Sequence, residues 1–326
     1  MLRRTRMDTP QGAMAALEFG DPARDLSCLF LHATGFNAMT YQSILAPLGL
    51  RARVAALDQR GHGRSELAYK TSFVSWNGFR DDVIRWIEHH APNGLVLGGH
   101  SMGGTVSLLV AGKRPDLVKG LVLADPVILP PAVYRANHLN PLAPLLMKNH
   151  SMARTARKRR SRFPSAGDVK SSYAGRGAFA TWREPFLDDY LLDGVLEMEP
   201  TTGNTEEETW ILSCAPAMES AVFAAQRNRP WRALAKVRKA KIPLSILRAE
   251  KGSVMTDATA QRILRTYSDA TVKTIRGTSH FLPMEAPYAV REELSAYLSR
   301  IIEGFGAADE GPVQRSLERT QGTRTS

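Results

Sequence analysis

Apolar runs of strand length alternate with longer mixed segments through the first 125 residues. Four of these runs lie at residues 26–31, 53–57, 94–97 and 120–124. They are apolar on consecutive positions rather than on every second one, which is typical of parallel strands buried on both faces. The pattern therefore predicts a buried parallel sheet.

The segment between the second and third runs has the period of a helix. Apolar residues recur there at positions i, i+4, i+7 and i+8 and so share one face: Phe79, Val83, Trp86 and Ile87. Strands that alternate with helices predict an α/β fold, in which helices cover both faces of a mostly parallel sheet. The strands' carboxyl ends then share one rim, where ligands bind in such folds.

The pattern changes between residues 130 and 241, where apolar runs of strand length disappear and the sequence is mostly helical in character. Strand-like runs return at residues 242–248 and 271–275. The chain is therefore expected to comprise a flexible N-terminus (1–11), a core in two parts (12–129 and 242–304), an inserted helical cap (130–241) and a disordered tail (305–326).

A glycine-rich stretch directly follows the third apolar run. Residues 99–103 are Gly-His-Ser-Met-Gly, which matches G-x-S-x-G with Ser101 at its centre. Between a strand and a helix, this pattern places the serine on a tight, strained turn that exposes its hydroxyl. The N–H groups of the following helix then point toward any negative charge that develops there. Ser101 is thus a candidate nucleophile, with a glycine-rich loop devoid of chemistry as the alternative.

Several stretches together resemble the α/β-hydrolase fold family. The shared features are the motif around Ser101, His32 after the first apolar run, the turn-rich residues 58–65, and residues 279–281 (Ser-His-Phe). The resemblance extends over about residues 12–128 and 241–303, and the segment 130–241 takes the place of that family's cap, after the sixth strand. It implies a serine-nucleophile hydrolase with a helical cap.

The resemblance also implies the remaining members of a catalytic triad. His280 follows the last strand-like run and would be the base, because this fold carries its triad in the order serine, acid, histidine. The acid usually follows the seventh strand, but Ser253 stands there. Two carboxylates stay open: Asp125, favoured because it leaves an apolar strand beside the serine, and Glu250. Their structural alternatives are a turn cap and a surface ion pair.

An oxyanion hole requires two main-chain N–H groups. Met102 follows the nucleophile and would supply one of them. By resemblance, the other comes from Thr34 in the loop after the first strand. Ala33 replaces that loop's usual glycine and Gly35 comes two positions late, so Phe36 is the alternative donor.

Composition restricts the partners. The 326 residues carry a net charge of +11, and six cations gather between Arg154 and Arg162 without interleaved aromatic residues or a nucleic-acid motif. We expect this cluster to be a solvated helix face, with an anionic substrate or surface as the alternative, and we expect no nucleic-acid partner. The sequence contains no apolar stretch of spanning length, no secretory signal and two cysteines, which favours a cytoplasmic protein without stable membrane insertion.

The resemblance implies hydrolysis of a carboxylic ester or lactone through a Ser-His-acid triad and an acyl-enzyme. No cofactor and no metal are expected, because the sequence has no Cys/His cluster with metal-ligand spacing. Aromatic residues in the predicted cap favour a small apolar substrate. We expect the protein to be a monomer or a homodimer. Two alternatives stay open: the same machinery acting on another bond, as a C–C hydrolase, amidase or acyltransferase, and a non-catalytic ligand-binding protein.

Overall fold

The computed structural model describes residues 2–198 and 210–309, of which residues 301–309 are described by their backbone alone. Its main sheet has the strand order β1-β2-β4-β3-β5-β6-β10-β11. The strands are β1 (Leu2–Thr9), β2 (Gly12–Phe19), β3 (Leu26–Leu31), β4 (Arg53–Leu57), β5 (Leu95–His100), β6 (Val118–Ala124), β10 (Leu244–Ala249) and β11 (Thr271–Ile275). The six strands from β4 to β11 in this order pair in parallel. Strand β2 pairs antiparallel with both β1 and β4.

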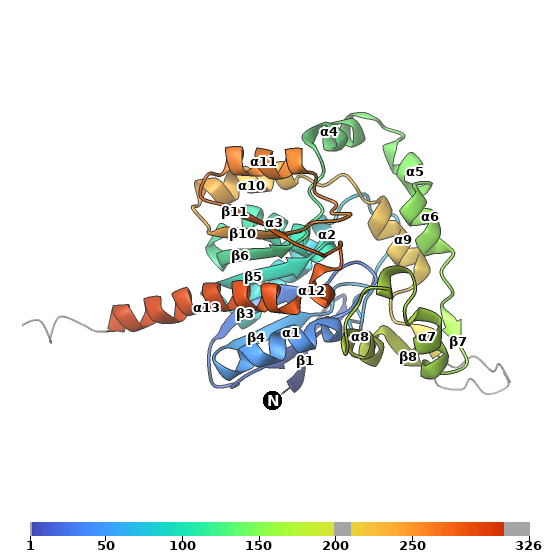
Figure 1. Ribbon diagram of the computed structural model, residues 1–326, viewed down its shortest axis with the longest axis horizontal. Helices are drawn as coiled ribbons and strands as arrows, with labels where there is room; N and C mark the ends of the chain where they lie inside the picture. The colour runs from blue at the N-terminus through green and yellow to red at the C-terminus, as the bar shows by residue number, and fades with distance from the viewer. Residues whose placement is uncertain (1, 199–209, 310–326) are drawn as a thin grey trace, which may run out of the picture.

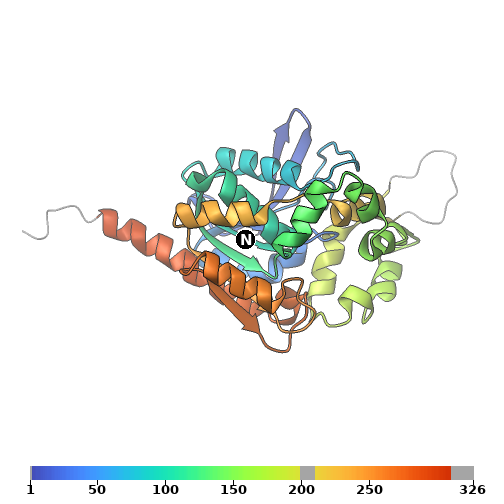
Figure 2. The same cartoon turned by 90° about the horizontal axis from the view of Figure 1, so that it is seen from above.

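Alternate residues of the central strands supply two separate apolar cores. Leu29 and Leu31 of β3 face one core, while Cys28 and Phe30 face the other. The first core packs under α2 (Asn77–His90), α3 (Met102–Lys113), α10 (Pro230–Lys239) and α11 (Asp257–Thr266). The second packs under α1 (Gln42–Leu45) and α13 (Pro287–Asp309), as Figures 1 and 2 show. Helices therefore cover both faces, which confirms the predicted α/β fold.

The chain between β6 and α10 lies beside the carboxyl ends of the central strands (Figure 1). Its elements are α4 (Pro131–Leu139), α5 (Ala143–Lys148), α6 (Ser151–Arg157), β7 (Arg162–Phe163), α7 (Ala166–Tyr173), η4 (Gly177–Phe179), α8 (Phe186–Gly194), β8 (Val195–Glu197), β9 (Trp210–Leu212) and α9 (Pro216–Ala224). The prediction that strands are absent here was wrong, because β7, β9 and β8 form a small sheet. Strands of two or three residues are too short to produce an apolar run.

The N-terminal segment also differs from its prediction. Residues 1–11 were expected to be flexible, and residue 1 lies outside the described residues, but β1 pairs with β2 along its whole length. Of the β1 side chains, only Met7 is buried, so the strand lacks the apolar pattern that marks the others. Hydrogen bonds to β2 and ion pairs from Arg3 to Glu18 and from Arg4 to Asp193 hold it instead.

The chain after β3 forms three short turns, η1 (Ala38–Tyr41), α1 and η2 (Ala46–Leu50), because Pro47 and Gly49 interrupt a longer helix. Helix α13 extends to Asp309, past the predicted core boundary at 304. The rest of the predicted tail, 310–326, lies outside the described residues. None of the helices in the described ranges combines the length and hydropathy needed to cross a membrane.

Candidate active site

Ser101 occupies the sharp turn between β5 and α3. Its backbone has φ 55° and ψ −117°, a conformation that non-glycine residues rarely adopt, and its N–H donates to the Ala124 carbonyl at 3.0 Å. Glycine is required two positions before and two positions after Ser101. A Cβ at Gly103 would lie 2.2 Å from the Leu31 oxygen, and one at Gly99 would lie 2.5 Å from the Gly103 carbonyl carbon. The close packing of this turn therefore lifts the serine above the sheet.

His280 joins Ser101 to a carboxylate. It lies in the loop between β11 and α12 (Leu282–Glu285). Its Nε2 is 2.9 Å from Ser101 Oγ, and its Nδ1 is 2.6 Å from Asp125 Oδ2. Because Asp125 accepts the Nδ1–H, Nε2 is the nitrogen left to take the serine proton. The structure thus brings together three of the residues that the sequence singled out, from three different strand ends.

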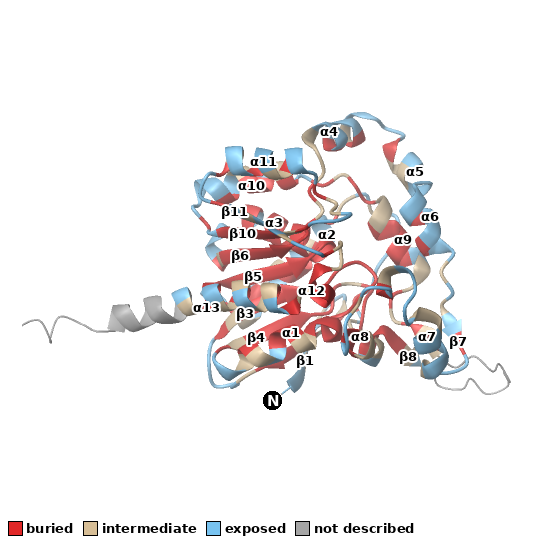
Figure 3. Ribbon diagram, in the orientation of Figure 1, coloured by how far each residue is buried: buried red, intermediate tan, exposed pale blue. Residues whose placement is uncertain are grey.

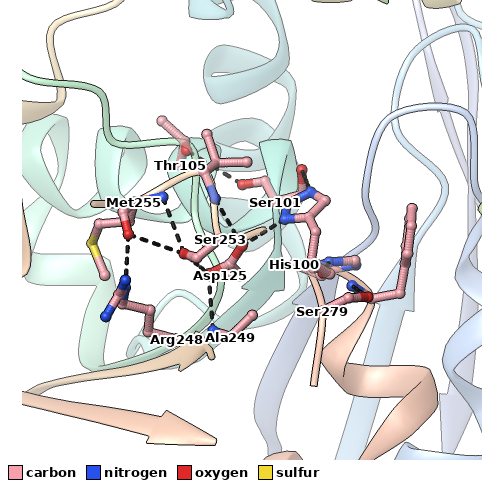
Figure 4. A network of polar contacts seen from close by, with 12 residues as sticks. His100, Ser101, Thr105, Asp125, Arg248, Ala249, Ser253, Met255 and Ser279 are labelled. Carbon is pink, nitrogen blue, oxygen red and sulfur yellow. Dashed lines mark hydrogen bonds and ion pairs between the residues drawn. The ribbon is translucent and has the colours of Figure 1, made fainter. Parts of the chain in front are cut away.

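The surroundings of Asp125 favour its ionised form. Burial raises the pKa of this carboxyl, but hydrogen bonds from His280, Ser253 and the Ala249 N–H outweigh it and hold the pKa below its ordinary value. The Ala249 N–H donates at 3.1 Å, and the Ser253 hydroxyl donates to the same oxygen, Oδ1 (Figure 4). Ser253, which stands where relatives place the acid, therefore supports the carboxylate of the neighbouring strand.

Glu250, the alternative acid, lies elsewhere. Its side chain is exposed, and its Oε2 accepts a hydrogen bond from the Gly277 N–H at 2.9 Å. The alternative interpretation of Glu250, a surface ion pair with Lys251 or Arg248, is not found among the described contacts, and Arg248 pairs instead with Asp257. Glu250 therefore braces the turn before the histidine loop, while Asp125 contacts the imidazole.

The predicted oxyanion donors differ in what their N–H groups already bind. The Phe36 N–H donates to the Ala33 carbonyl at 3.1 Å, so this alternative donor is occupied. Within the described part of the chain, the Thr34 N–H has no acceptor. Met102 is the first residue of α3, where N–H groups lack partners within the helix. Of the three predicted donors, Thr34 and Met102 thus have N–H groups without an acceptor among the described residues.

His32 fixes the loop that carries Thr34. Its Nδ1 donates to the Ala33 carbonyl at 2.8 Å, and its Nε2 accepts from the Gln59 N–H at 2.9 Å. Burial, reinforced by the neighbouring His62, lowers the pKa of His32 well below its ordinary value. The ring is therefore neutral and serves as a support for the loop.

A second histidine links the same loop to His280, a connection that the sequence did not predict. The Ala33 N–H donates to the Tyr41 hydroxyl at 3.1 Å, and that hydroxyl donates to His100 Nδ1 at 2.8 Å. His100 Nε2 donates to the His280 carbonyl at 2.8 Å. Burial and the nearby His280 lower the pKa of His100 to about 3, so the ring stays neutral and keeps this donor pattern. The one signal in the sequence was the position of His100 beside Ser101.

The segment predicted as a cap contributes a mostly buried ion pair next to the Thr34 loop, which the sequence also missed. Arg159 Nη1 lies 3.0 Å from Glu219 Oε2, and its other nitrogens donate to the hydroxyls of Tyr173 and Tyr190 at 3.1 Å. A Cβ at Gly35 would lie 2.8 Å from Glu219 Oε1. The pair therefore ties the ends of α6, α7, α8 and α9 together directly against the residue after Thr34.

Aromatic side chains border the same loop. The Phe36 ring lies 5.0 Å from Trp182 and 6.2 Å from Phe281, measured between ring centroids. Two of the cap aromatics, Phe186 and Tyr190, are buried in the second core.

Among the described residues, no group of three or more His, Cys, Asp or Glu side chains is arranged to hold a metal ion.

The comparison with protein families agrees with this geometry. The model of the alpha/beta hydrolase family matches residues 28–293. The chain belongs to that family. The match runs from β3 through β11, includes the segment between β6 and β10, and contains all the candidate residues above, so the resemblance drawn from the motifs is confirmed. Membership makes the protein a hydrolase by family.

Individual relatives match shorter segments. The 2-(acetamidomethylene)succinate hydrolase of Mesorhizobium japonicum is 35% identical over 97 residues, 30% of this chain and 34% of that protein. An esterase of Mycobacterium tuberculosis is 33% identical over 124 residues, 38% of this chain and 39% of the esterase. The chain thus matches between a third and two fifths of the length of these curated relatives.

A solved structure extends the likeness to the whole fold. The crystal structure of E-2-(acetamidomethylene)succinate hydrolase aligns with a TM-score of 0.71 at 21% identity, covering 92% of this chain and 100% of that one. At this level of identity, the likeness shows a shared fold.

Proposed function

We propose that this family member is a serine hydrolase of carboxylic esters or lactones that works through Ser101, His280 and Asp125. The observation that carries the proposal is the unbroken chain of contacts from Ser101 Oγ to His280 Nε2 and from His280 Nδ1 to Asp125 Oδ2, at 2.9 and 2.6 Å. This is the geometry in which an imidazole activates a hydroxyl.

In the proposed mechanism, His280 Nε2 takes the proton as Ser101 Oγ attacks the carbonyl carbon. The N–H groups of Met102 and Thr34 stabilise the oxyanion that forms. The alcohol leaves with the proton from His280, and the acyl group stays on Ser101. Water then gives a proton to His280 and attacks the acyl carbon. As the bond from the acyl carbon to Ser101 Oγ breaks, His280 returns that proton to Oγ, which releases the acid and restores the serine.

Asp125 supports both halves of this cycle. Its carboxylate, whose pKa lies below the ordinary value, stays ionised at neutral pH and compensates the charge of the imidazolium. It also keeps the Nδ1–H tautomer, so that Nε2 faces the serine. The Ala249 N–H and Ser253 hydroxyl fix the carboxylate in place.

The substrate side of the site supports an apolar acyl or alcohol group. The rings of Phe36, Trp182 and Phe281 lie against one another beside residues 32–36, the loop that carries Thr34 and is called the oxyanion loop below. They offer apolar surface next to the reacting carbonyl. The similarity to a mycobacterial protein named an esterase supports an ester as the substrate class.

The same machinery acting on a different bond is the second candidate. The observation that favours it is the similarity, in both sequence and fold, to a protein named for hydrolysis of 2-(acetamidomethylene)succinate. A non-catalytic binding role is less well supported, because a binding protein has no need for a hydroxyl, an imidazole and a carboxylate in hydrogen-bond order.

A series of p-nitrophenyl esters of increasing acyl length, with the matching anilides, tests the proposal. We expect ester hydrolysis, and we expect Ser101→Ala to reduce kcat by at least about 1,000-fold, as loss of a triad nucleophile does. Ser299→Ala on α13 serves as the matched control and should keep full activity. Ester hydrolysis that survives Ser101→Ala would contradict the proposal, and Ser101-dependent cleavage of anilides alone would favour the second candidate.

A further inference from the structure

Exposed apolar side chains gather on one stretch of the cap. Among the described residues, thirteen large hydrophobic side chains are exposed, and six of these lie between residues 131 and 152. Five of the six are at least 50% exposed: Leu139, Leu142, Leu145, Leu146 and Met152. Scattered single leucines are ordinary on protein surfaces, but a concentration of this kind marks an interaction surface.

The same stretch is uniformly basic. Residues 126–167 contain eight Lys and Arg residues and no Asp or Glu, in a chain that has 32 acidic residues. Four of these cations are exposed and form no ion pair with any residue in the described ranges: Arg135, Lys148, Arg154 and Lys158. We call these four cations and the five exposed apolar residues the cap patch. Its positive charge is thus not neutralised by described neighbours.

The elements that carry the cap patch face outward together. Helices α5 and α6 both contact α9. They turn Ala143, Ala153 and Ala156 inward, which leaves their leucines and cations outside. Figure 1 shows α4, α5 and α6 in succession along the outer edge of the cap, and Figure 3 shows exposed residues along that edge.

We propose that the cap patch docks the protein on an anionic lipid surface. Aliphatic side chains flanked by Lys and Arg fit an interface where phosphate headgroups lie directly above acyl chains. The leucines would enter the acyl boundary while the cations contact the headgroups. The proposed contact is peripheral, with the leucines reaching no deeper than the acyl boundary.

Other occupants fit the patch less well. A nucleic acid would contact the cations through its phosphates but leave the five aliphatic side chains unused. A single strand would also need exposed aromatic rings for stacking, and Tyr134, the aromatic residue of α4–α6, is buried. A second copy of the chain, related by two-fold symmetry, would bring the same unpaired cations face to face. A lipid surface satisfies both the aliphatic and the cationic side chains.

Docking through the cap patch also has a consequence for the candidate site. Helix α6 leads directly to Arg159, whose partner Glu219 lies on α9 against the oxyanion loop. The patch and the loop are thus connected by two packed helices, so the lipid surface would lie on the cap side of the site. The inference itself does not depend on the proposed ester hydrolysis.

Co-sedimentation of the full chain with vesicles tests the proposal. We expect binding to phosphatidylglycerol vesicles, much weaker binding to vesicles of phosphatidylcholine alone, and weaker binding as salt rises. The variant Lys148→Glu/Arg154→Glu/Lys158→Glu should bind at least about 100-fold less tightly. Leu145→Ser/Leu146→Ser should lose about tenfold, because apolar insertion is reduced.

A matched charge reversal separates this site from general positive charge. Arg232, Lys236 and Lys239 are exposed on α10, so Arg232→Glu/Lys236→Glu/Lys239→Glu makes the same change in net charge. We expect it to keep most of the vesicle binding, with thermal melting confirming that every variant is folded. Equal loss in the two charge-reversed variants would overturn the proposal. So would unchanged binding of the leucine variant, or a dimer in solution that this variant dissociates.

Discussion

Asp125 and Glu250 follow neighbouring strands, yet their surroundings differ sharply. The Asp125 side chain is fully buried and receives hydrogen bonds from His280, Ser253 and a main-chain N–H, while Glu250 is exposed and bonds to a turn. An ionised carboxylate held in this way retains its charge and its position as the imidazole becomes protonated. The contacts therefore assign the proposed triad acid to Asp125.

Replacing each carboxylate by its amide tests that assignment. We expect Asp125→Asn to lower kcat by about 10,000-fold, because the amide favours the wrong imidazole tautomer. Glu250→Gln is the matched control and should lower kcat by less than about threefold, because its contact lies on the surface. Steady-state kinetics on one ester distinguish them. A reversed order of the two effects would transfer the acid role to Glu250.

Tyr41 makes a separate residue-scale prediction. Tyr41→Phe removes the hydroxyl between the Ala33 N–H and His100 Nδ1 and leaves both buried groups without a partner. We expect the unfolding free energy to fall by about 2 kcal/mol. We also expect a larger change in kcat than in KM, because the hydroxyl links the Thr34 loop to the loop that carries His280. Urea unfolding and kinetics measure the two effects. Tyr288→Phe, at an exposed tyrosine, should change neither.

The sequence identified Ser101 and His280 because each lies in a local motif at a strand end. The acid was harder to choose, because the choice depends on whether β6 or β10 delivers a carboxylate to His280. Ser253 appeared to be a gap in the usual pattern, but its hydroxyl bonds to Asp125 across the sheet. The link through Tyr41 and His100 likewise joins positions 59 residues apart. Pair contacts of this kind leave no periodic trace along the chain.

At the scale of elements, four cap helices converge on a single ion pair over the oxyanion loop. Arg159 lies just after α6 and contacts side chains of α7, α8 and α9. Both charged side chains are mostly buried, at 19% and 12% exposure. Removing one partner would therefore leave an uncompensated charge in a poorly solvated place.

We therefore expect Glu219→Ala to lower the free energy of unfolding by about 2 kcal/mol. The cap offers a matched control in Asp188, which pairs with Lys170 at a site where both side chains are 49% exposed. Asp188→Ala should cost less than about 0.5 kcal/mol, because exposed pairs contribute little. Thermal or urea unfolding measures both variants, and equal losses would argue against the proposed importance of the Arg159–Glu219 pair.

The cap helices as a class could be predicted from the sequence, but their contacts could not. The segment lacks apolar runs of strand length, so the helical interpretation held for most of it. The small sheet of β7, β8 and β9 was missed because each strand has three residues or fewer. Arg159 was placed in a solvated cluster, since charge patterning alone does not distinguish it from its exposed neighbours.

At the scale of the whole molecule, the cap is tied to the sheet edge by buried charges. Asp193 of α8 is fully buried and pairs with Arg4 of β1 and with Arg64. Asp58 lies nearby and accepts hydrogen bonds from the Ala38 and Arg64 N–H groups. Burial nevertheless raises the pKa of Asp58 to about 7. The Arg4–Asp193 pair explains why a β1 strand with few apolar residues is nonetheless held in place.

A raised pKa at Asp58 has a defined effect on stability. Between its ordinary pKa of 3.8 and about 7, the folded chain holds a proton that the unfolded chain releases. The stability from this carboxyl is therefore present at low pH and declines as the pH rises through that range. The lowered pKa of Asp125 acts in the opposite sense, because its contribution declines as the pH falls below the ordinary value.

We expect Asp58→Asn to flatten the dependence of unfolding free energy on pH between about pH 5 and about pH 7. The wild-type chain should lose more stability than the variant on going from the lower to the higher pH. Urea unfolding at the two pH values measures this difference. Identical slopes in the two proteins would show that Asp58 does not titrate in this window.

The proposed mechanism requires that His280 activate Ser101 as a nucleophile. Labelling with a fluorophosphonate probe, followed by peptide mass spectrometry, tests it most directly, because the probe reacts with activated serines and needs no knowledge of the substrate. We predict one label per chain, located on Ser101, that is absent in Ser101→Ala and forms at least about 1,000-fold more slowly in His280→Ala. Labelling of another serine, or undiminished labelling of Ser101 in His280→Ala, would contradict the proposed activation of Ser101 by His280.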